Sequence, residues 1–258
     1  MGLAVDLIRH WYINSLIRNN FSINKILSQK YNYVFVKKTE SNQFTRYTKD
    51  MGNRDVSSLE WREEFNGVTI DCSLQIAKHS GGNTVFLIIP GVDGSLDGFE
   101  DKYLRIAEGV HSKHGHTVYQ MENPFITSQH WESNVRQMLD HIYLDHDVDE
   151  IHVMAHSAGA WTIGKIAHEF PEINKLLLVN PATNDVDSYV EGLAKAPYIH
   201  TNFVLGEKDP SAAYGEQFRD IENHHGVNVV VVEEADHHFS GDALNHFIDA
   251  PHIYLYKQ

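Results

Sequence analysis

The sequence has little cysteine, few basic residues and no long apolar run. These shortages argue against a disulfide within the chain, a nucleic-acid partner and a membrane span. Its single cysteine, Cys72, cannot form a disulfide within the chain, which points to a reducing compartment. Lys and Arg together number 21 against 35 for Asp and Glu, so the formal net charge is −14. A chain of this charge repels nucleic-acid phosphates, and we expect no nucleic-acid partner.

Membrane and cofactor signatures are also missing. No run approaches the roughly 18 apolar residues of a membrane span, and Asp6, Arg9 and His10 interrupt the apolar N-terminus where a signal peptide would need its core. We therefore expect a cytoplasmic protein without a membrane span. Neither a P-loop nor a dinucleotide-binding glycine pattern occurs, and the 18 histidines follow no zinc motif. We expect neither a nucleotide cofactor nor a metal ion.

The length of 258 residues, with 42% hydrophobic residues, is enough for one large α/β domain. Apolar residues at helical spacing predict an amphipathic helix over residues 2–18. We expect residues 1–60 to form this helix and an extension that packs on the main domain, which spans residues 61–258. The helix is also a candidate for a homodimer contact.

Strand patterns begin at residue 61. Asn66 and Gly67 lie between two strand-like runs and predict a hairpin with a type I′ turn. The run at 84–89 is apolar without alternation, as in a central strand covered on both faces. Strands and helices then alternate, which predicts a mostly parallel sheet with helices on both faces. The further strands are predicted at 116–121, 151–154, 176–179, 202–205 and 227–232, and the helices at 99–114, 129–144, 185–195 and 211–223.

Residues 151–159, Ile-His-Val-Met-Ala-His-Ser-Ala-Gly, combine a short strand, a turn and the start of a helix. A sharp strand-to-helix turn exposes the Oγ of its serine, here Ser157, and directs the free N–H groups of the helix N-terminus at an oxyanion. Such a turn needs small neighbours, which Ala155 and Gly159 supply. The pattern indicates a nucleophilic serine, although serine is also a common N-cap of ordinary helices.

The loops after the other predicted strands carry further candidates, because parallel α/β sheets place functional loops at the carboxyl ends of their strands. The strand at 84–89 is followed by Pro-Gly-Val-Asp-Gly and the strand at 202–205 by Gly-Glu-Lys-Asp. The strand at 227–232 is followed by Glu-Glu-Ala-Asp-His-His-Phe.

The sharp strand-to-helix turn around Ser157 is of the kind called a nucleophile elbow. With this elbow and the order serine, acid, histidine along the sequence, the chain resembles the α/β-hydrolase family over residues 61–258. The matching parts are the elbow around Ser157, Asp209 in a Gly-x-x-Asp-Pro loop, and a histidine in an Ala-Asp-His-His-Phe-Ser-Gly loop. The resemblance implies the α/β-hydrolase fold with a minimal cap. It also implies a triad of Ser157, Asp209 and His237.

In this family the backbone N–H groups of Val92 and Ala158 would form the oxyanion hole. Two alternatives to the triad stay open. Glu207 lies on the same loop as the expected acid and could replace it. His238 is the reserve base, because adjacent loop residues point in different directions and only one histidine can face the serine.

The resemblance implies a serine hydrolase without a cofactor, and we expect a carboxylesterase acting on a small-molecule acyl substrate. A thioesterase, an amidase or peptidase, and an acyltransferase would use the same triad. A catalytically silent binding protein that keeps the fold is the alternative of another class. The lid of the family commonly follows the strand at 176–179, and residues 180–197 allow about one helix. We therefore expect a partly open pocket and short or medium acyl groups.

Overall fold

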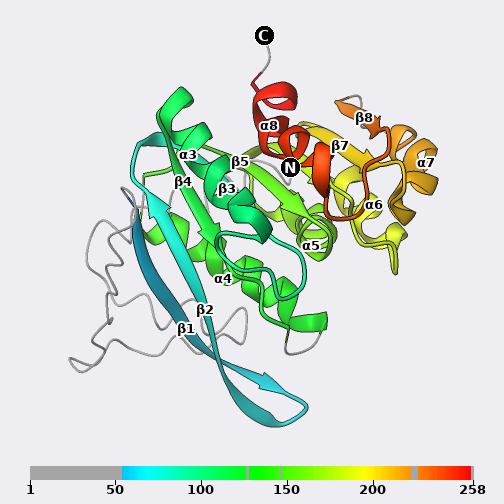
Figure 1. Cartoon of the computed structure of the whole chain (residues 1–258). Coiled ribbons are helices and arrows are strands. Elements are labelled where there is room, and N and C mark those ends of the chain that lie inside the picture. The colour runs from blue at the N-terminus through cyan, green and yellow to red at the C-terminus, as the bar shows by residue number, and fades with distance from the viewer. Residues whose placement is uncertain (1–53, 126–127, 146, 222–225, 257–258) are drawn as a thin grey trace. The chain divides into compact units, whose positions relative to one another are not determined.

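The computed structural model describes residues 54–125, 128–145, 147–221 and 226–256 (Figure 1). The helix predicted at residues 2–18, and with it the candidate dimer contact, lies outside the described residues. The first described strand begins at Asp55, within the region that we expected to form an extension.

The chain divides into two compact units, residues 1–44 with 60–73 and residues 45–59 with 74–258. In the first unit, the described part is the end of a β-hairpin. Asn66 and Gly67 form its turn, with φ angles of 50° and 77°. Two successive positive φ angles define the type I′ turn, so this prediction is confirmed.

Eight strands form one sheet in the order β1-β2-β4-β3-β5-β6-β7-β8. β2 pairs with β4 antiparallel, and every pairing from β4 onward to β8 is parallel. The predicted, mostly parallel sheet is therefore confirmed. The strands are β1 (Asp55–Phe65), β2 (Val68–His79), β3 (Gly82–Ile89), β4 (His116–Met121), β5 (Glu150–His156), β6 (Ile173–Val179), β7 (His200–Gly206) and β8 (Val227–Val232).

Helices cover both faces of the parallel strands. The chain steps from β3 to β4 in one direction and from β4 to β5 in the other, so right-handed crossovers put α3 and α4 on opposite faces. α3 packs with α8, whereas α4, α5 and α6 follow one another in contact (Figure 1). The helices are α3 (Lys102–His114), α4 (Ser128–Asp145), α5 (Ala158–Ile166), α6 (Val186–Ala194), α7 (Gly215–Arg219) and α8 (Leu244–Tyr254).

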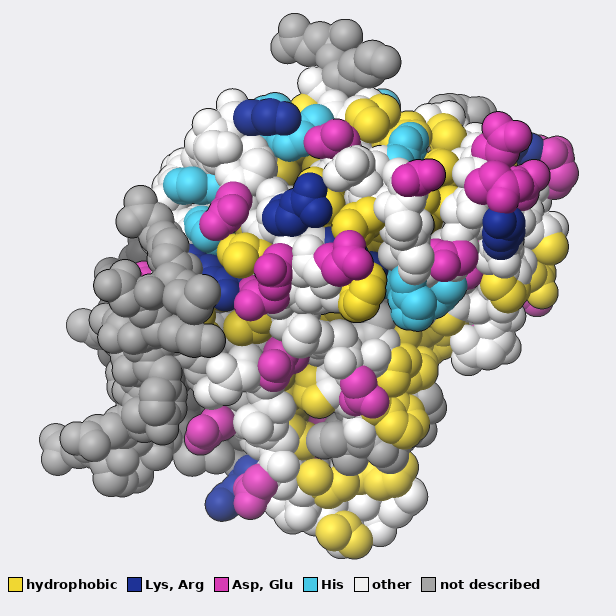
Figure 2. All heavy atoms as spheres, in the orientation of Figure 1, with side chains coloured by type: hydrophobic (Ala, Val, Ile, Leu, Met, Phe, Trp, Pro, Cys, Tyr) yellow, Lys and Arg dark blue, Asp and Glu magenta, His cyan; other side chains and the backbone are white. Residues whose placement is uncertain are grey.

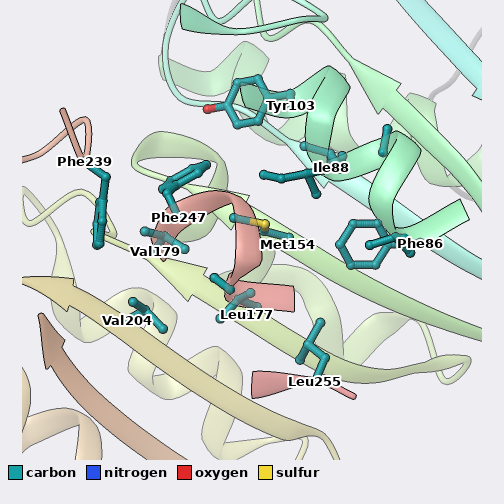
Figure 3. Packing of buried hydrophobic residues seen from close by; sticks show 14 of the residues in the cluster. Phe86, Ile88, Tyr103, Met154, Leu177, Val179, Val204, Phe239, Phe247 and Leu255 are labelled. Atoms are coloured by element: carbon teal, nitrogen blue, oxygen red, sulfur yellow. The ribbon is translucent and has the colours of Figure 1, made fainter. Parts of the chain in front are cut away.

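The core between the sheet and the α3–α8 pair is apolar and closely packed (Figure 3). Phe86 and Ile88 of β3 point into it, and the intervening Leu87 is equally buried on the opposite side of the strand. This burial on both faces explains why the β3 run does not alternate. The other members that Figure 3 labels are Tyr103, Met154, Leu177, Val179, Val204, Phe239, Phe247 and Leu255.

The helix predicted over residues 211–223 was wrong in form. The structure has a 3₁₀ helix at Pro210–Tyr214, followed by the short α7, which ends at Arg219. The side chain of Asp209 accepts a hydrogen bond from the Ser211 amide, and Pro210 occupies the first position of the helix. The segment therefore begins with a capped 3₁₀ turn, which helical periodicity alone does not reveal.

Candidate active site

Ser157 occupies a strained turn between β5 and α5. Its φ and ψ angles are 54° and −121°, outside the regions that residues with a side chain normally adopt. Hydrogen bonds hold both sides of the residue: its amide donates to Val179 of β6 at 3.0 Å, and its carbonyl accepts from Trp161 of α5 at 3.1 Å. The strain is therefore maintained by the neighbouring elements.

Two glycines allow the loop after β3 to approach this turn. A Cβ atom added to Gly91 would lie 3.0 Å from the Cβ of Ser157. A Cβ atom on Gly159 would lie 2.5 Å from the carbonyl oxygen of Pro90 and 2.7 Å from Cγ2 of Ile89. These approaches explain the small residues that the sequence places around the serine.

Replacing Gly159 by alanine should destabilise the fold by about 1–3 kcal/mol, the usual cost of adding a methyl group to a packed interior. The change would appear in urea denaturation as a lower midpoint at an unchanged slope. Gly215→Ala on α7 is the matched control, because its new methyl would have its closest neighbour at 3.8 Å. Equal midpoints for the two variants would contradict the close approach.

Three strand ends bring Ser157, His237 and Asp209 together. Nε2 of His237, in the loop after β8, lies 3.0 Å from Oγ of Ser157. Nδ1 of the same ring lies 2.5 Å from Oδ2 of Asp209, which follows β7. The side chain of Asp209 is 2% exposed and that of His237 is 39% exposed. The carboxylate is thus shielded while the imidazole can be reached from solvent.

The surroundings of Asp209 keep it charged. Burial alone would raise its pKa, but hydrogen bonds from His237 and Ser211 outweigh burial and hold the pKa below its ordinary value. Ser211 bonds Oδ1 twice, from its amide at 2.8 Å and from its hydroxyl at 2.5 Å. Oδ2 is left to the imidazole, which the carboxylate can orient and stabilise in its cationic form.

The side chains of the two alternatives, Glu207 and His238, are directed differently from those of Asp209 and His237. The carboxylate of Glu207 accepts a hydrogen bond from the Glu234 amide at 2.9 Å, on the side of the loop toward β8. The ring of His238 stands at 75° to that of His237, with 5.1 Å between the ring centroids. Among the described residues, the imidazole bonded to Ser157 is that of His237.

The residues expected at the oxyanion hole flank the serine. Ala158 is the first residue of α5, so its amide precedes the first hydrogen bond within the helix. Backbone hydrogen bonds hold the loop of Val92. The Asp93 amide donates to the Asn123 carbonyl at 2.9 Å, and the Gly94 amide donates to the Gly91 carbonyl at 3.1 Å. Among the described residues, the amide of Val92 has no acceptor, which leaves it free for a ligand oxygen.

Sequence reasoning missed the side chains that hold these loops, above all Asn180 and His156. Asn180 directly follows β6 and is fully buried; His156 directly precedes Ser157 and is 4% exposed. Both donate hydrogen bonds to the main chain of the loop that carries His237. A signal for Asn180 was present, because it stands at the carboxyl end of a predicted strand, as do the other site residues.

Across the described residues, no group of three or more His, Cys, Asp or Glu side chains is arranged to hold a metal ion. None of the described helices combines the length and the apolar character needed to cross a membrane. On the face seen in Figure 2, acidic side chains are widely scattered and gather near β8 and α7 at the upper right.

Neither a protein-family model nor a curated protein sequence matches this chain. Several solved structures do. Est1E from Butyrivibrio proteoclasticus matches with a TM-score of 0.55 at 14% identity, over 77% of this chain and 99% of that one. Alpha/beta hydrolase domain-containing protein 10 from mouse matches with a TM-score of 0.55 at 13% identity, over 76% and 98%.

An alpha-beta serine hydrolase homologue from Coxiella burnetii matches with a TM-score of 0.54 at 14% identity, over 74% of this chain and 94% of that one. At identities this low, the matches are evidence about the fold alone. They agree with the resemblance that the sequence shows. The chain therefore has the fold of the α/β-hydrolase superfamily.

Proposed function

We propose that the protein is a serine hydrolase, and that it acts as a carboxylesterase through an acyl-enzyme on Ser157. One observation carries the proposal: an unbroken series of hydrogen bonds runs from Ser157 Oγ through the ring of His237 to Asp209, at a turn that strains the serine backbone. A buried carboxylate, an imidazole and an exposed hydroxyl in this order are the parts that acyl transfer needs. Similarity in fold to Est1E and to a serine hydrolase homologue supports it.

In the first half-reaction, Ser157 Oγ attacks the acyl carbon and its proton moves to Nε2 of His237. The carbonyl oxygen becomes an oxyanion, which the amides of Val92 and Ala158 are placed to stabilise. One such donor contributes on the order of 3 kcal/mol to the transition state. The bond to the leaving oxygen then breaks, and His237 returns the proton to that oxygen as the alcohol departs.

In the second half-reaction, a water molecule attacks the acyl-enzyme and gives its proton to His237. The bond between the acyl carbon and Ser157 Oγ breaks, and the proton passes to Oγ. The products are the free acid and the original enzyme, so no metal or redox cofactor enters the balance. The ionised Asp209 stabilises the imidazolium in both halves.

The substrate proposal, short or medium acyl groups, rests on how open the site is. The side chain of His237 is 39% exposed and Val92 is 43% exposed. The helix that could serve as a lid, α6, is packed into the body of the fold: a Cβ atom on Gly192 would lie 2.5 Å from the carbonyl oxygen of Lys165 in α5. Tyr189 of the same helix is fully buried. Long chains would therefore find little additional apolar cover in this segment.

Measured over p-nitrophenyl esters of increasing chain length, kcat/KM should be highest for short or medium acyl groups. Each added methylene contributes about 0.8 kcal/mol only where it is removed from water, so an open site stops gaining early. Methyl ferulate belongs in the panel, because one of the similar structures is Est1E with ferulic acid bound. A steep rise toward the longest chains would contradict the open site and indicate that another part of the chain covers it.

The same residues would serve a thioesterase, an amidase or peptidase, or an acyltransferase. These activities differ in the leaving group or in the acceptor that clears the acyl-enzyme. Parallel assays with an ester, a thioester and an amide of one acyl group, each with and without an alcohol acceptor, separate them. The proposal expects the ester to be turned over fastest, with water as the acceptor.

A further inference from the structure

The main-chain carbonyl of His237 accepts hydrogen bonds from two buried side chains. Nε2 of His156 lies 2.8 Å from this oxygen and Nδ2 of Asn180 lies 3.0 Å from it. His237 belongs to a loop, so neither a helix nor a strand pairing determines where its peptide sits. The two side chains therefore fix the position from which the imidazole extends.

Asn180 joins this loop to the loop of the acid. Its Nδ2 also donates to the carbonyl of Asp236 at 3.1 Å, and its Oδ1 accepts from the amide of Gly206 at 2.7 Å. The main-chain N–H of Gly206 can only donate and the main-chain carbonyls can only accept, so these partners determine which end of the Asn180 side-chain amide faces each loop. One planar group thus connects the segment before Asp209 to the segment that carries His237.

Asparagine suits this position for two reasons. Its φ angle is 42°, a region that asparagine tolerates better than most residues with a side chain. Its side chain offers an acceptor and a donor separated by one rigid amide group, as the two loops require. An aspartate would have nearly the same shape but could not donate to the carbonyl of His237.

In its neutral form, His156 can play the same part only with its proton on Nε2. Burial, together with the charge of Lys102, holds the pKa of His156 well below its ordinary value of 6.5. The hydroxyl of Tyr103 lies 3.2 Å from Nδ1, and burial raises the pKa of that tyrosine. A protonated Tyr103 hydroxyl can donate to Nδ1, which leaves Nε2 as the protonated nitrogen that faces the His237 carbonyl. Figure 3 shows Tyr103 at the edge of the buried cluster, with its hydroxyl directed away from Ile88.

A third buried side chain holds the next peptide. Nζ of Lys102 lies 3.3 Å from the carbonyl oxygen of His238 and 4.3 Å from the centre of the Phe247 ring. Burial lowers the pKa of this lysine to about 8. Three successive carbonyls, those of Asp236, His237 and His238, are therefore each held by a buried side chain from another element.

We infer that Asn180 and His156 are positioning residues, which hold the His237 imidazole in line between Ser157 and Asp209 through the His237 carbonyl. The inference rests on the proposed function for its effect on turnover, but not for its effect on geometry. A shift of about 1 Å in a reacting group can cost on the order of 10²-fold in rate. The loss should fall on kcat, because both side chains are buried and bond to the main chain of the loop.

The test compares Asn180→Asp with Asn202→Asp. Asn202, on β7, is a matched control, because its Nδ2 also donates to a main-chain carbonyl, that of Tyr254, at 3.2 Å. Asn180→Asp should lower kcat about 10²-fold with little change in KM, and Asn202→Asp should leave both unchanged. The second readout is the ¹H NMR signal of the proton between His237 and Asp209, which the 2.5 Å separation should move far downfield. That signal is assigned by its absence in His237→Ala. It should move upfield or vanish in Asn180→Asp and stay unchanged in Asn202→Asp.

A pair of variants at His156 keeps the inference open to test if Asn180→Asp does not fold. His156→Gln retains a donor near the position of Nε2, whereas His156→Leu retains the bulk without a donor. The glutamine variant should keep most of the activity and the downfield signal, and the leucine variant should lose both. Equal behaviour of these variants, or wild-type turnover and signal in a folded Asn180→Asp protein, would overturn the inference. If the wild type hydrolyses none of the esters, the proposed function fails, and the downfield signal alone still decides this inference.

Discussion

Ser157→Ala should lower kcat by a factor on the order of 10⁶ while the protein stays folded. In the proposed mechanism Oγ forms the covalent bond to the acyl group, and among the described residues no other hydroxyl is hydrogen-bonded to the His237 ring. Triad knockouts in serine hydrolases reach losses of this size, and the binding site and oxyanion donors supply what remains. The measurement is the steady-state rate on the best p-nitrophenyl ester, with urea denaturation of both proteins to compare their stability.

Ser188→Ala is the control for this variant. Ser188 lies on α6, and its hydroxyl donates to the carbonyl of Asp185, away from the triad. Its loss should leave kcat unchanged. A Ser157→Ala protein that retains a tenth of the wild-type rate would rule out Ser157 as the nucleophile.

Of the two adjacent histidines, only His237 should be needed for chemistry. In the proposed mechanism His237 takes the proton of Ser157, so we expect His237→Ala to cost on the order of 10⁴-fold or more in kcat. His238→Ala is a control one residue away on the same loop. Its ring bonds to neither Ser157 nor Asp209 among the described residues, so its removal should cost less than tenfold.

The pair can be measured in one experiment, as kcat on a single ester across a range of pH. Wild type and His238→Ala should have similar kcat at each pH, and His237→Ala should stay far below both. An inactive His238→Ala beside an active His237→Ala would reverse the assignment of the base.

Local sequence patterns predicted much of the fold. The unbroken apolar run of β3 predicted a strand buried on both faces, and Leu87 and its neighbours are buried. The Asn-Gly pair at 66–67 predicted the turn that the backbone adopts. These predictions held because each depends on residues close together in the chain and on one physical rule.

Sequence patterns reached less far where a single side-chain bond or a distant group helps to decide the structure. The segment after Asp209 was predicted as one helix, but it begins as a 3₁₀ helix at which the Asp209 side chain accepts a capping bond from the Ser211 amide. Asn180 and His237 are 57 residues apart, and nothing near either residue indicates that their loops meet. His156 reads equally well as one polar residue in a short strand, since its role depends on burial against other elements.

The elbow and the order of the loops pointed to a set of candidates, and the hydrogen-bond geometry favours one acid and one histidine for the proposed triad. Glu207 and Asp209 lie on one loop, yet only the aspartate lies within hydrogen-bond distance of the His237 ring. The choice follows from the direction of each side chain. That direction is set by the bonds of Glu207 to the β8 side and of Asp209 to Ser211, which no spacing rule encodes.

The most direct test of the central claim, that Ser157 is an activated nucleophile, is covalent labelling by a fluorophosphonate probe followed by mass spectrometry. The intact protein should gain the mass of one probe, and peptide mapping should place it on Ser157. Ser157→Ala should stay unlabelled, and His237→Ala should react far more slowly than His238→Ala. An intact, folded wild-type protein that remains unlabelled beside an active control enzyme would contradict the claim and favour a silent binding protein with this fold. An adduct on any other residue would place the nucleophile elsewhere.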